Sequence, residues 1–370
     1  MERKFWVDAV KAVCMIIVYL LHSQIYSGWS GRDYIYFALP FYVNAFFFAS
    51  GYLFYGKWLF IDSSLLTKKE YKRSLCNVFF HIVVPTLLFS TLVYLPKQMF
   101  HGNDLILRKY AFDVLGGISY WFTAALAVAQ LILLSAVFIL KKQRVWVYAI
   151  VSIVCLGVGL YLHIIQQGNA PEDYFPWYYR FGLECTFLMT CGGIYRCYEN
   201  RINRIMKYGL VAVLLVYVSV LVWSDSTGHM LLTFGLQTGQ NCDLTGIVCV
   251  LCGITLLTAL CKWLRPMEWL AYVGRNSLIF YFFSGVYPAM TSVVVRRLPF
   301  PDLGYAKVVF VMLVSFLLGY ATVFVINRYF PFLIDLRKLK RQLGSYDKTE
   351  AGCFCIPGFC LRLSLARLTG

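Results

Sequence analysis

Charged side chains are scarce in this sequence. Asp, Glu, Lys and Arg make up 14% of the 370 residues, whereas 60% are hydrophobic. A soluble globular protein has about a quarter of its residues charged, so this composition excludes that class. The apolar runs reach about twenty residues, the length that a helix needs to cross the hydrocarbon core of a bilayer. We therefore expect an integral membrane protein whose spans contact the lipid bilayer.

Acidic residues are scarcer than basic ones, at 18 against 34, which gives a net charge of +16. A basic excess indicates nucleic-acid binding when it forms a patch or a stripe. Here the basic residues lie in short blocks between apolar runs, the distribution that sets membrane topology. No nucleic-acid partner is expected.

Three other features are absent. The 13 cysteines show no paired extracellular spacing, so no disulfide framework is indicated. No small-x-small cleavage site closely follows the first apolar run, so we expect a retained helix rather than a signal peptide. The longest connections, 57–74, 97–117 and 225–241, are too short for a soluble domain. Segment 97–117 mixes apolar and polar residues and is expected either to lie on the outer surface or to dip back into it.

Hydropathy predicts an all-α bundle of about ten transmembrane helices, with both ends on the cytoplasmic side. The predicted spans are 8–27, 34–56, 75–96, 118–140, 145–164, 178–196, 208–224, 242–261, 276–295 and 305–327. This topology places about three quarters of the Lys and Arg residues on the cytoplasmic side, as the positive-inside rule requires. The transmembrane domain is expected to cover residues 1–335.

Residues 336–370 differ in character from the bundle. The run from Arg337 to Arg341 is a basic cluster that suits anionic lipid headgroups. Cys353, Cys355 and Cys360 leave a metal or a palmitoyl interpretation open, but three thiols without a fourth ligand make a poor zinc site. No metal is expected, and the tail is expected to be cytoplasmic and disordered.

The first predicted span contains Asp8, Lys11 and His22. At about 100° per residue, the three fall within about 60° of one another on one stripe of the helix. Ionisable groups inside a membrane span cost free energy unless they face a partner or a wet cavity, which makes Lys11 and His22 functional candidates. Asp8 and Lys11 also suit a simple i,i+3 pair that anchors the helix at the interface. His22 lies about 16 Å further along the helix.

Two other spans begin with or contain aromatic segments. The second contains Asn44-Ala-Phe-Phe-Phe-Ala-Ser50-Gly51-Tyr52, in which the Ser-Gly step permits close approach between helices. The fourth opens with Tyr120-Trp121-Phe122, which by itself indicates an aromatic belt at the outer interface.

Polar residues stand at the entrances to the sixth and ninth spans. Arg180 and Glu184, at spacing i,i+4, either pair with each other or face an outer polar cavity. The segment Gly274-Arg275-Asn276-Ser277-Leu-Ile-Phe-Tyr281 contains an Asn-Ser pair that looks like a helix N-cap. Free backbone N–H groups beside Arg275 would suit an anionic group approaching from the cytoplasm.

Together, these motifs resemble the integral-membrane acyltransferase 3 family. They are, in order, Asp-x2-Lys-x10-His, Phe-Phe-Phe-Ala-Ser-Gly-Tyr, Tyr-Trp-Phe and Gly-Arg-Asn-Ser-Leu-x2-Tyr, and the resemblance runs over residues 5–335. The branch that looks most similar is the fucose 4-O-acetylase-like group. The resemblance implies O-acetylation of a cell-surface polysaccharide or lipid-linked glycan, with acetyl-CoA as cytoplasmic donor. It also implies a bacterial source and hence a bacterial cytoplasmic membrane.

By this resemblance, His22 matches the histidine of the family's first span. Lys11 stands where the family more often has Arg, so the charge is kept but the bidentate fork of Arg is lost. Asn44 stands where the family often has Pro. Ser284 stands where a histidine frequently follows Tyr281, which removes any role for a histidine in the ninth span.

Acyl transfer to a hydroxyl needs a general base or a nucleophilic acyl carrier, and histidine serves as either near neutral pH. The expected catalytic group is His22 with Lys11 and Asp8, and Asn44 or Ser50 as donors to the oxyanion. The expected donor-binding residues are Lys11, Lys72, Arg73, Arg275, Asn276 and Ser277. The expected acceptor-binding residues are Trp121, Arg180, Glu184 and Tyr281.

Two other classes compete with the enzyme. A membrane exporter of a glycan, similar to poly-N-acetylglucosamine exporters, or of a small solute would also suit ten spans with a polar interior. Such a transporter often has repeated halves with interrupted helices, and no internal repeat is evident here. A structural or assembly subunit would leave the buried Lys and His without a purpose.

Overall fold

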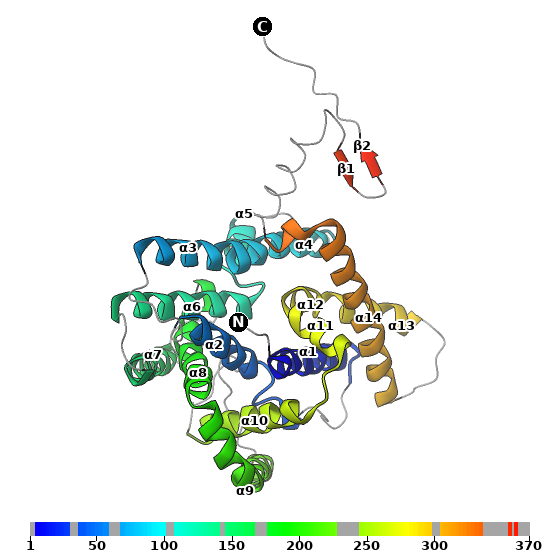
Figure 1. Ribbon diagram of the computed structural model, residues 1–370. Coiled ribbons are helices and arrows are strands. Elements are labelled where there is room, and N and C mark those ends of the chain that lie inside the picture. The colour runs from blue at the N-terminus through cyan, green and yellow to red at the C-terminus, as the bar shows by residue number, and fades with distance from the viewer. Residues whose placement is uncertain are drawn as a thin grey trace.

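Helix α1 (Phe5–Tyr26) is the central element of the structure, a computed structural model. It is apolar on nearly every side, as a helix surrounded by other helices must be. The helices that contact it are α2 (Asn44–Trp58), α10 (Leu244–Trp263), α11 (Glu268–Arg275), α12 (Ser277–Phe283), α13 (Val286–Arg297) and α14 (Tyr305–Tyr329) (Figure 1). The stripe predicted to carry chemistry therefore lies inside the bundle.

The structure describes residues 4–29, 36–58, 67–100, 107–140, 145–166, 176–227, 244–297, 304–335, 354–356 and 359–361. All of these segments are helices with short turns, apart from one hairpin in the tail. Its strands β1 (Phe354–Ile356) and β2 (Phe359–Leu361) pair antiparallel. The remaining residues of the tail, Cys353 and the basic cluster 337–341 among them, lie outside the described segments.

A second group of helices packs around α8 (Tyr179–Cys197), which contacts α2, α6 (Trp121–Leu140) and α7 (Val145–Gln166). Glycine permits this packing, because a Cβ on Gly51 would overlap the carbonyl oxygen of Met189. A Cβ on Gly192 would likewise overlap the carbonyl oxygen of Phe48. The interpretation of the Ser50-Gly51 step as a point of close helix approach is confirmed.

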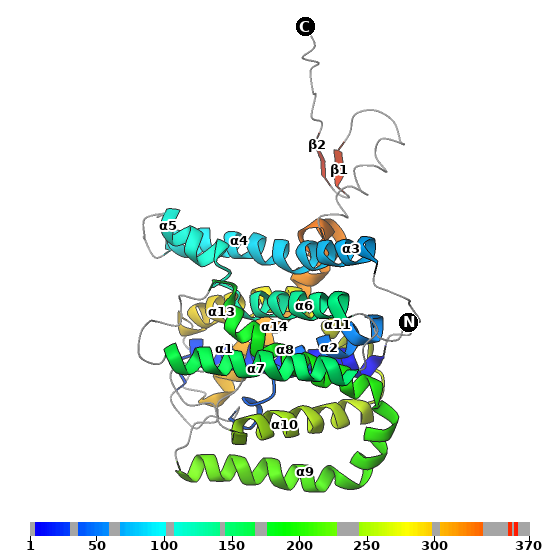
Figure 2. The same cartoon turned by 90° about the vertical axis from the view of Figure 1, so that its left-hand side faces the viewer.

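The other elements enclose these two groups in layers of roughly parallel helices, with α3 and α4 at one edge and α9 at the opposite edge (Figure 2). They are α3 (Lys68–Val78), a π-helical turn (Phe79–Val83), α4 (Val84–Phe100), α5 (Leu107–Tyr110), a second π-helical turn (Ala111–Leu115) and α9 (Glu199–Thr227). Three 3₁₀ turns occur at Tyr36–Ala38, Pro176–Tyr178 and Pro331–Leu333. Segment 97–117 is thus partly helical where the structure describes it.

Within the described segments, seven helices are long and apolar enough to cross a membrane, or eight if the bent pair α12 and α13 forms one span. The protein is therefore an all-helical integral membrane protein. Two of the predicted spans differ from this set. Span 34–56 corresponds to α2, which has only 15 residues because 36–43 form turns. Span 178–196 corresponds to α8, which contains Arg180, Glu184 and Arg196.

Candidate functional site

The two ends of α1 define the two ends of the bundle. At the Lys4 end, α1 begins, α2 ends and α8 turns into α9, and Figure 2 places α3 and α11 toward the same end. At the opposite end, the His22 end, α1 finishes at Tyr26. The helix is continuous, so Lys4 and His22 are separated by about 27 Å along its axis.

His22 is half-buried, and its ring stacks on that of Tyr26, with centroids 6.1 Å apart and an interplanar angle of 20°. The Tyr26 hydroxyl lies 4.0 Å from the position of a Cβ on Gly285. Gly285 lies in the break between α12 and α13, whose axes differ by 45°. Breaks of this kind in membrane helices line ligand sites in transporters, because they leave backbone groups free to bind. His22 is therefore close to an interrupted helix.

Beside His22, the hydroxyl of Ser23 is fully buried and has no hydrogen-bond partner among the described residues. His22 itself has ring stacking but no hydrogen bond within the same segments. A histidine available to accept a proton needs a ring nitrogen that is not committed to a structural hydrogen bond. The surroundings of His22 meet that requirement.

The aromatic motifs converge on α12. Three hydrogen bonds hold this helix: Tyr19 Oη donates to Phe280 O (3.0 Å), Tyr120 Oη to Phe282 O (2.7 Å), and the Phe122 N–H to Tyr281 Oη (3.3 Å). Phe122 is the second residue of α6, where a backbone N–H has no partner within the helix, so Tyr281 satisfies it. The Phe122 ring also lies 4.9 Å from that of Phe47. Motifs from four distant parts of the sequence thus meet beside α1.

The predicted acceptor-binding residues extend this aromatic group. The Trp121 ring lies 6.3 Å from the ring of Phe181, over which the Arg180 guanidinium is stacked at 4.3 Å. Arg180 and Glu184 are only 2% and 5% exposed. Trp121, Tyr281 and Arg180 are therefore linked through shared aromatic neighbours, and Glu184 lies one turn from Arg180.

The backbone that leads into α8 is strained. Trp177 and Tyr178 have φ values of 60° and 45°, in the left-handed region that bulky residues avoid. The strain is held by two hydrogen bonds, from Trp177 N to Gly116 O (2.6 Å) and from Trp177 Nε1 to Leu115 O (3.0 Å). Conformations of this kind are concentrated at functional sites. Their position next to Arg180 supports the choice of this region as a candidate site.

The predicted oxyanion donors lie elsewhere on α2. Asn44 is buried at the start of this helix, and its Nδ2 donates to the carbonyl of Pro40 at 2.7 Å. Its Oδ1 is buried without a partner among the described residues. Ser50 is half-buried. No hydrogen bond in the described part of the chain joins either residue to His22, so their role stays a prediction.

Asp8 lies on the face of α1 that meets α11, and Lys11 follows three residues later on the same helix. Asp8 is 3% exposed, and a Cβ on Gly274 would overlap its carbonyl oxygen. The glycine of the Gly-Arg-Asn-Ser motif is therefore the residue that lets α11 touch α1. Lys11 is half-buried.

The other predicted donor-binding residues are distributed over three helices, α3, α11 and α12. Lys72 and Arg73 are exposed on α3. Arg275 is exposed at the end of α11 and pairs with Glu268 at 3.4 Å. Ser277, half-buried, is the first residue of α12.

The predicted N-cap position is confirmed, but the capping hydrogen bond is absent. Asn276 occupies the N-cap position of α12, but its side chain makes no capping hydrogen bond. Its Nδ2 donates backward to the carbonyl of Tyr272 (2.8 Å), and its Oδ1 accepts from Asn327 Nδ2 (2.8 Å). The Asn276 side chain therefore ties α12 to α11 and α14 instead of closing the helix start.

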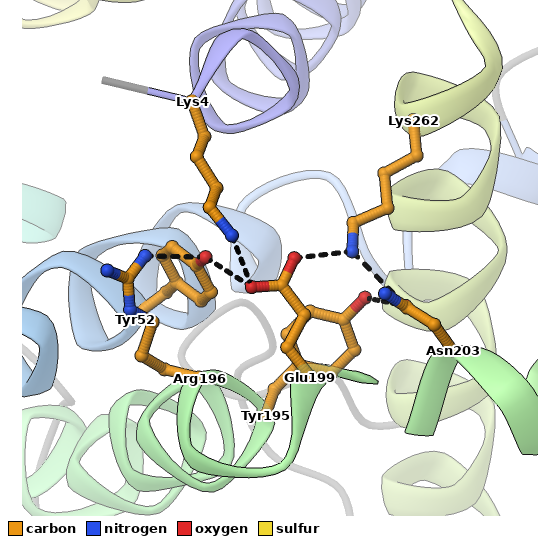
Figure 3. A network of polar contacts seen from close by, with 7 residues as sticks. All are labelled: Lys4, Tyr52, Tyr195, Arg196, Glu199, Asn203 and Lys262. Carbon is orange, nitrogen blue, oxygen red and sulfur yellow. Dashed lines mark hydrogen bonds and ion pairs between the residues drawn. The ribbon is translucent and has the colours of Figure 1, made fainter. Parts of the chain in front are cut away.

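A polar cluster at the Lys4 end was not predicted from the sequence. The Glu199 carboxylate accepts hydrogen bonds from Lys4 Nζ (2.7 Å), Lys262 Nζ (2.7 Å) and Tyr52 Oη (2.6 Å). The Tyr52 hydroxyl in turn accepts from Arg196 Nη1 at 2.6 Å. Figure 3 shows the carboxylate between the two ammonium groups. We call these five residues the Glu199 cluster.

The cluster joins the start of α1 to α2, α8, α9 and α10. Burial alone would lower the pKa of Lys4, but hydrogen bonds to Glu199 and Tyr52 outweigh it and raise that pKa above its ordinary value. Lys4 is therefore charged at neutral pH.

Two features of the sequence pointed toward this cluster. They are Tyr52, the last residue of the second-span motif, and Glu199, a single acidic residue within a basic segment.

Among the described residues, no group of three or more His, Cys, Asp and Glu side chains is arranged to hold a metal ion.

Comparison with known families gives one finding: a family model described as an acyltransferase domain, of the acyltransferase 3 type, matches residues 4–328. No curated protein and no solved structure matches the chain. The matched region includes every candidate site residue named above.

Proposed function

The chain belongs to the integral-membrane acyltransferase 3 family, and from that premise we propose that it transfers an acetyl group from acetyl-CoA to a hydroxyl of a cell-surface polysaccharide or lipid-linked glycan. The family makes the protein an acyltransferase. The acetyl group, the CoA donor, the glycan acceptor and a bacterial cytoplasmic membrane are our proposals. They rest on the resemblance of the motifs to the fucose 4-O-acetylase-like group.

One observation carries the proposal. The motifs of the first, second, fourth and ninth predicted spans meet around α12, beside the helix that bears His22. Packing alone accounts for each motif, but it does not account for a histidine with no hydrogen bond near a broken helix. Convergence of this kind supports a reaction centre at the His22 end.

The proposed chemistry is a thioester-to-ester exchange. The acceptor oxygen forms a bond to the acyl carbon, the carbon–sulfur bond breaks, and the hydroxyl proton passes to His22 and then to the departing thiolate. In the covalent variant, His22 attacks the acyl carbon, the carbon–sulfur bond breaks and CoA leaves as the thiol with the ring proton. A water-free site protects the acyl-imidazole until the acceptor hydroxyl displaces the imidazole, which takes up the hydroxyl proton. Asn44 and Ser50 remain the proposed donors to the oxyanion, and Lys11 and Asp8 the proposed charged pair beside the path.

The acceptor and the donor are proposed to enter from opposite ends. Trp121, Tyr281, Arg180 and Glu184 form or adjoin an aromatic group, and aromatic faces with a few buried polar groups suit sugar rings. The proposed donor residues Lys72, Arg73, Arg275, Asn276 and Ser277 belong to α3, α11 and α12, with Lys11 on α1. The pantetheine arm would pass along α1 toward His22.

A second candidate function is export of a glycan. The observation that favours it is the 45° break between α12 and α13, because interrupted helices are common in transporters. An exporter moves its glycan without breaking a thioester. The two functions therefore differ in whether CoA is released.

The test uses purified protein in nanodiscs, acetyl-CoA and a pool of surface glycans from the host. We expect CoA thiol to appear only when the glycan is present, together with an acetyl ester on the glycan detected by mass spectrometry. A protein that releases no CoA with any acceptor, but moves glycan across a proteoliposome membrane, is an exporter, and the acetylation proposal then fails.

A further inference from the structure

The Glu199 cluster contains more positive charge than its one carboxylate neutralises. Lys4 and Lys262 are cationic and both bind the one Glu199 carboxylate, which leaves one positive charge in excess among these three residues. The Lys262 and Glu199 side chains are 20% and 13% exposed. Excess charge of one sign at a partly buried place costs free energy unless an oppositely charged group is nearby. This imbalance indicates an additional anion.

An unsatisfied donor lies within the same group. Trp6 is 7% exposed, and its indole N–H has no acceptor among the described residues. Its ring lies 4.7 Å from that of Tyr52 and 5.0 Å beneath the Lys262 ammonium. A buried N–H without a partner is unfavourable, and native structures seldom leave one without a reason. A ligand that accepts hydrogen bonds would satisfy it.

Uncharged groups also hold the Lys262 side chain in place. In addition to its bond to Glu199, its ammonium donates to Asn203 Oδ1 at 3.1 Å, and that oxygen also accepts from Tyr195 Oη at 2.8 Å (Figure 3). Its ammonium lies 4.9 Å from the Tyr195 ring. The cation is thus positioned before any ligand arrives, which lowers the entropic cost of binding.

From these observations we propose that the Glu199 cluster, with the Trp6 N–H, binds the phosphate group of a ligand. A phosphate brings negative charge and several acceptor oxygens, which match the two lysine ammonium groups and an unused N–H donor. Glu199 occupies part of this field and competes with the incoming phosphate. Two sources share this chemistry: coenzyme A and an anionic phospholipid headgroup. The first source rests on the proposed function.

The experiment measures binding without turnover. The full chain in phosphatidylcholine nanodiscs is titrated with coenzyme A, with its 3′-dephospho form and with inorganic phosphate. Lys262→Met is expected to weaken binding of the phosphate ligand about tenfold or more, and Trp6→Phe, which keeps an aromatic ring, about threefold or more. Glu199→Gln is expected to tighten binding because it removes the competing charge. Arg204→Met, which removes an exposed cation of α9 outside the cluster, is the matched control.

A second arm identifies the source. The protein in nanodiscs that contain phosphatidylglycerol is analysed by native mass spectrometry. If the amount of this lipid retained by the protein changes in the Lys262 and Glu199 variants, the ligand is a lipid headgroup. The opposite responses of Lys262→Met and Glu199→Gln separate anion binding from general loss of structure, which would weaken binding in both. If both variants bind coenzyme A, phosphate and phosphatidylglycerol as Arg204→Met does, the proposal is wrong. This experiment does not measure acetyl transfer. The phosphate-site proposal can therefore be wrong while the proposed function is right, and the proposed function can be wrong while the phosphate site is right.

Discussion

Replacement of His22 by alanine is expected to lower acetyl transfer by about 100-fold or more, because general acid–base catalysis contributes factors of about 10²–10⁴. The expectation follows from the position of this ring, half-buried at the far end of α1 and near the break between α12 and α13. The measurement is the rate of acetyl ester formation on the glycan at saturating acetyl-CoA. His22→Gln, which keeps a polar side chain but cannot act as a base at neutral pH, is expected to be as inactive.

The matched control for this result is His81→Ala. His81 lies in the π-helical turn Phe79–Val83, has a side chain 45% exposed and pairs with Asp335 at 3.3 Å. It belongs to none of the four converging motifs, so its loss is expected to keep transfer within a few-fold of wild type. Equal losses in the two variants, or full activity in His22→Ala that binds coenzyme A normally, would rule out His22 as base or acyl carrier.

Replacement of Gly274 by alanine is expected to destabilise the protein strongly. The added Cβ would overlap the carbonyl oxygen of Asp8, so α11 has to move away from α1. Overpacking of side chains alone costs about 1–3 kcal/mol, and a clash with backbone cannot be relieved by a rotamer change. We expect a lower melting temperature and a lower yield of monodisperse protein, measured by fluorescence-detected size exclusion after heating.

Gly209→Ala supplies the comparison. Gly209 lies in α9, and a Cβ there would have no neighbour within 4 Å. Alanine has a higher helix propensity than glycine by about 1 kcal/mol, so this variant is expected to be as stable as wild type or more so. If Gly274→Ala and Gly209→Ala have the same melting temperature, the contact between α11 and α1 does not have the geometry described.

Local patterns predicted much of the fold. The apolar runs predicted the membrane bundle, and the Ser50-Gly51 step predicted the close contact of α2 with another helix. The α2 boundary was wrong by about ten residues because an apolar run of the right length does not show where turns replace the helix. Asn276 does stand at the N-cap position, but its capping hydrogen bond is absent because the side-chain oxygen that would cap accepts from Asn327 Nδ2 on α14 instead.

Parts of the candidate site were beyond prediction for a different reason. Lys4 and Glu199 are 195 positions apart in the chain, and Glu199 and Lys262 are 63 apart. No periodicity relates positions so distant, because only the packing of α1, α9 and α10 brings them together. The stripe on α1 was predictable because a single helix carries it.

We propose that the acetyl group passes from a donor at the Lys4 end to an acceptor at the His22 end. The most direct test reconstitutes the protein in proteoliposomes of known orientation, with acetyl-CoA confined to the side of the Lys4 end and the glycan confined to the other. We expect CoA release on the first side and acetylated glycan on the second, with neither in His22→Ala. Acetylation that requires donor and acceptor on the same side, or no CoA release in any arrangement, would contradict it.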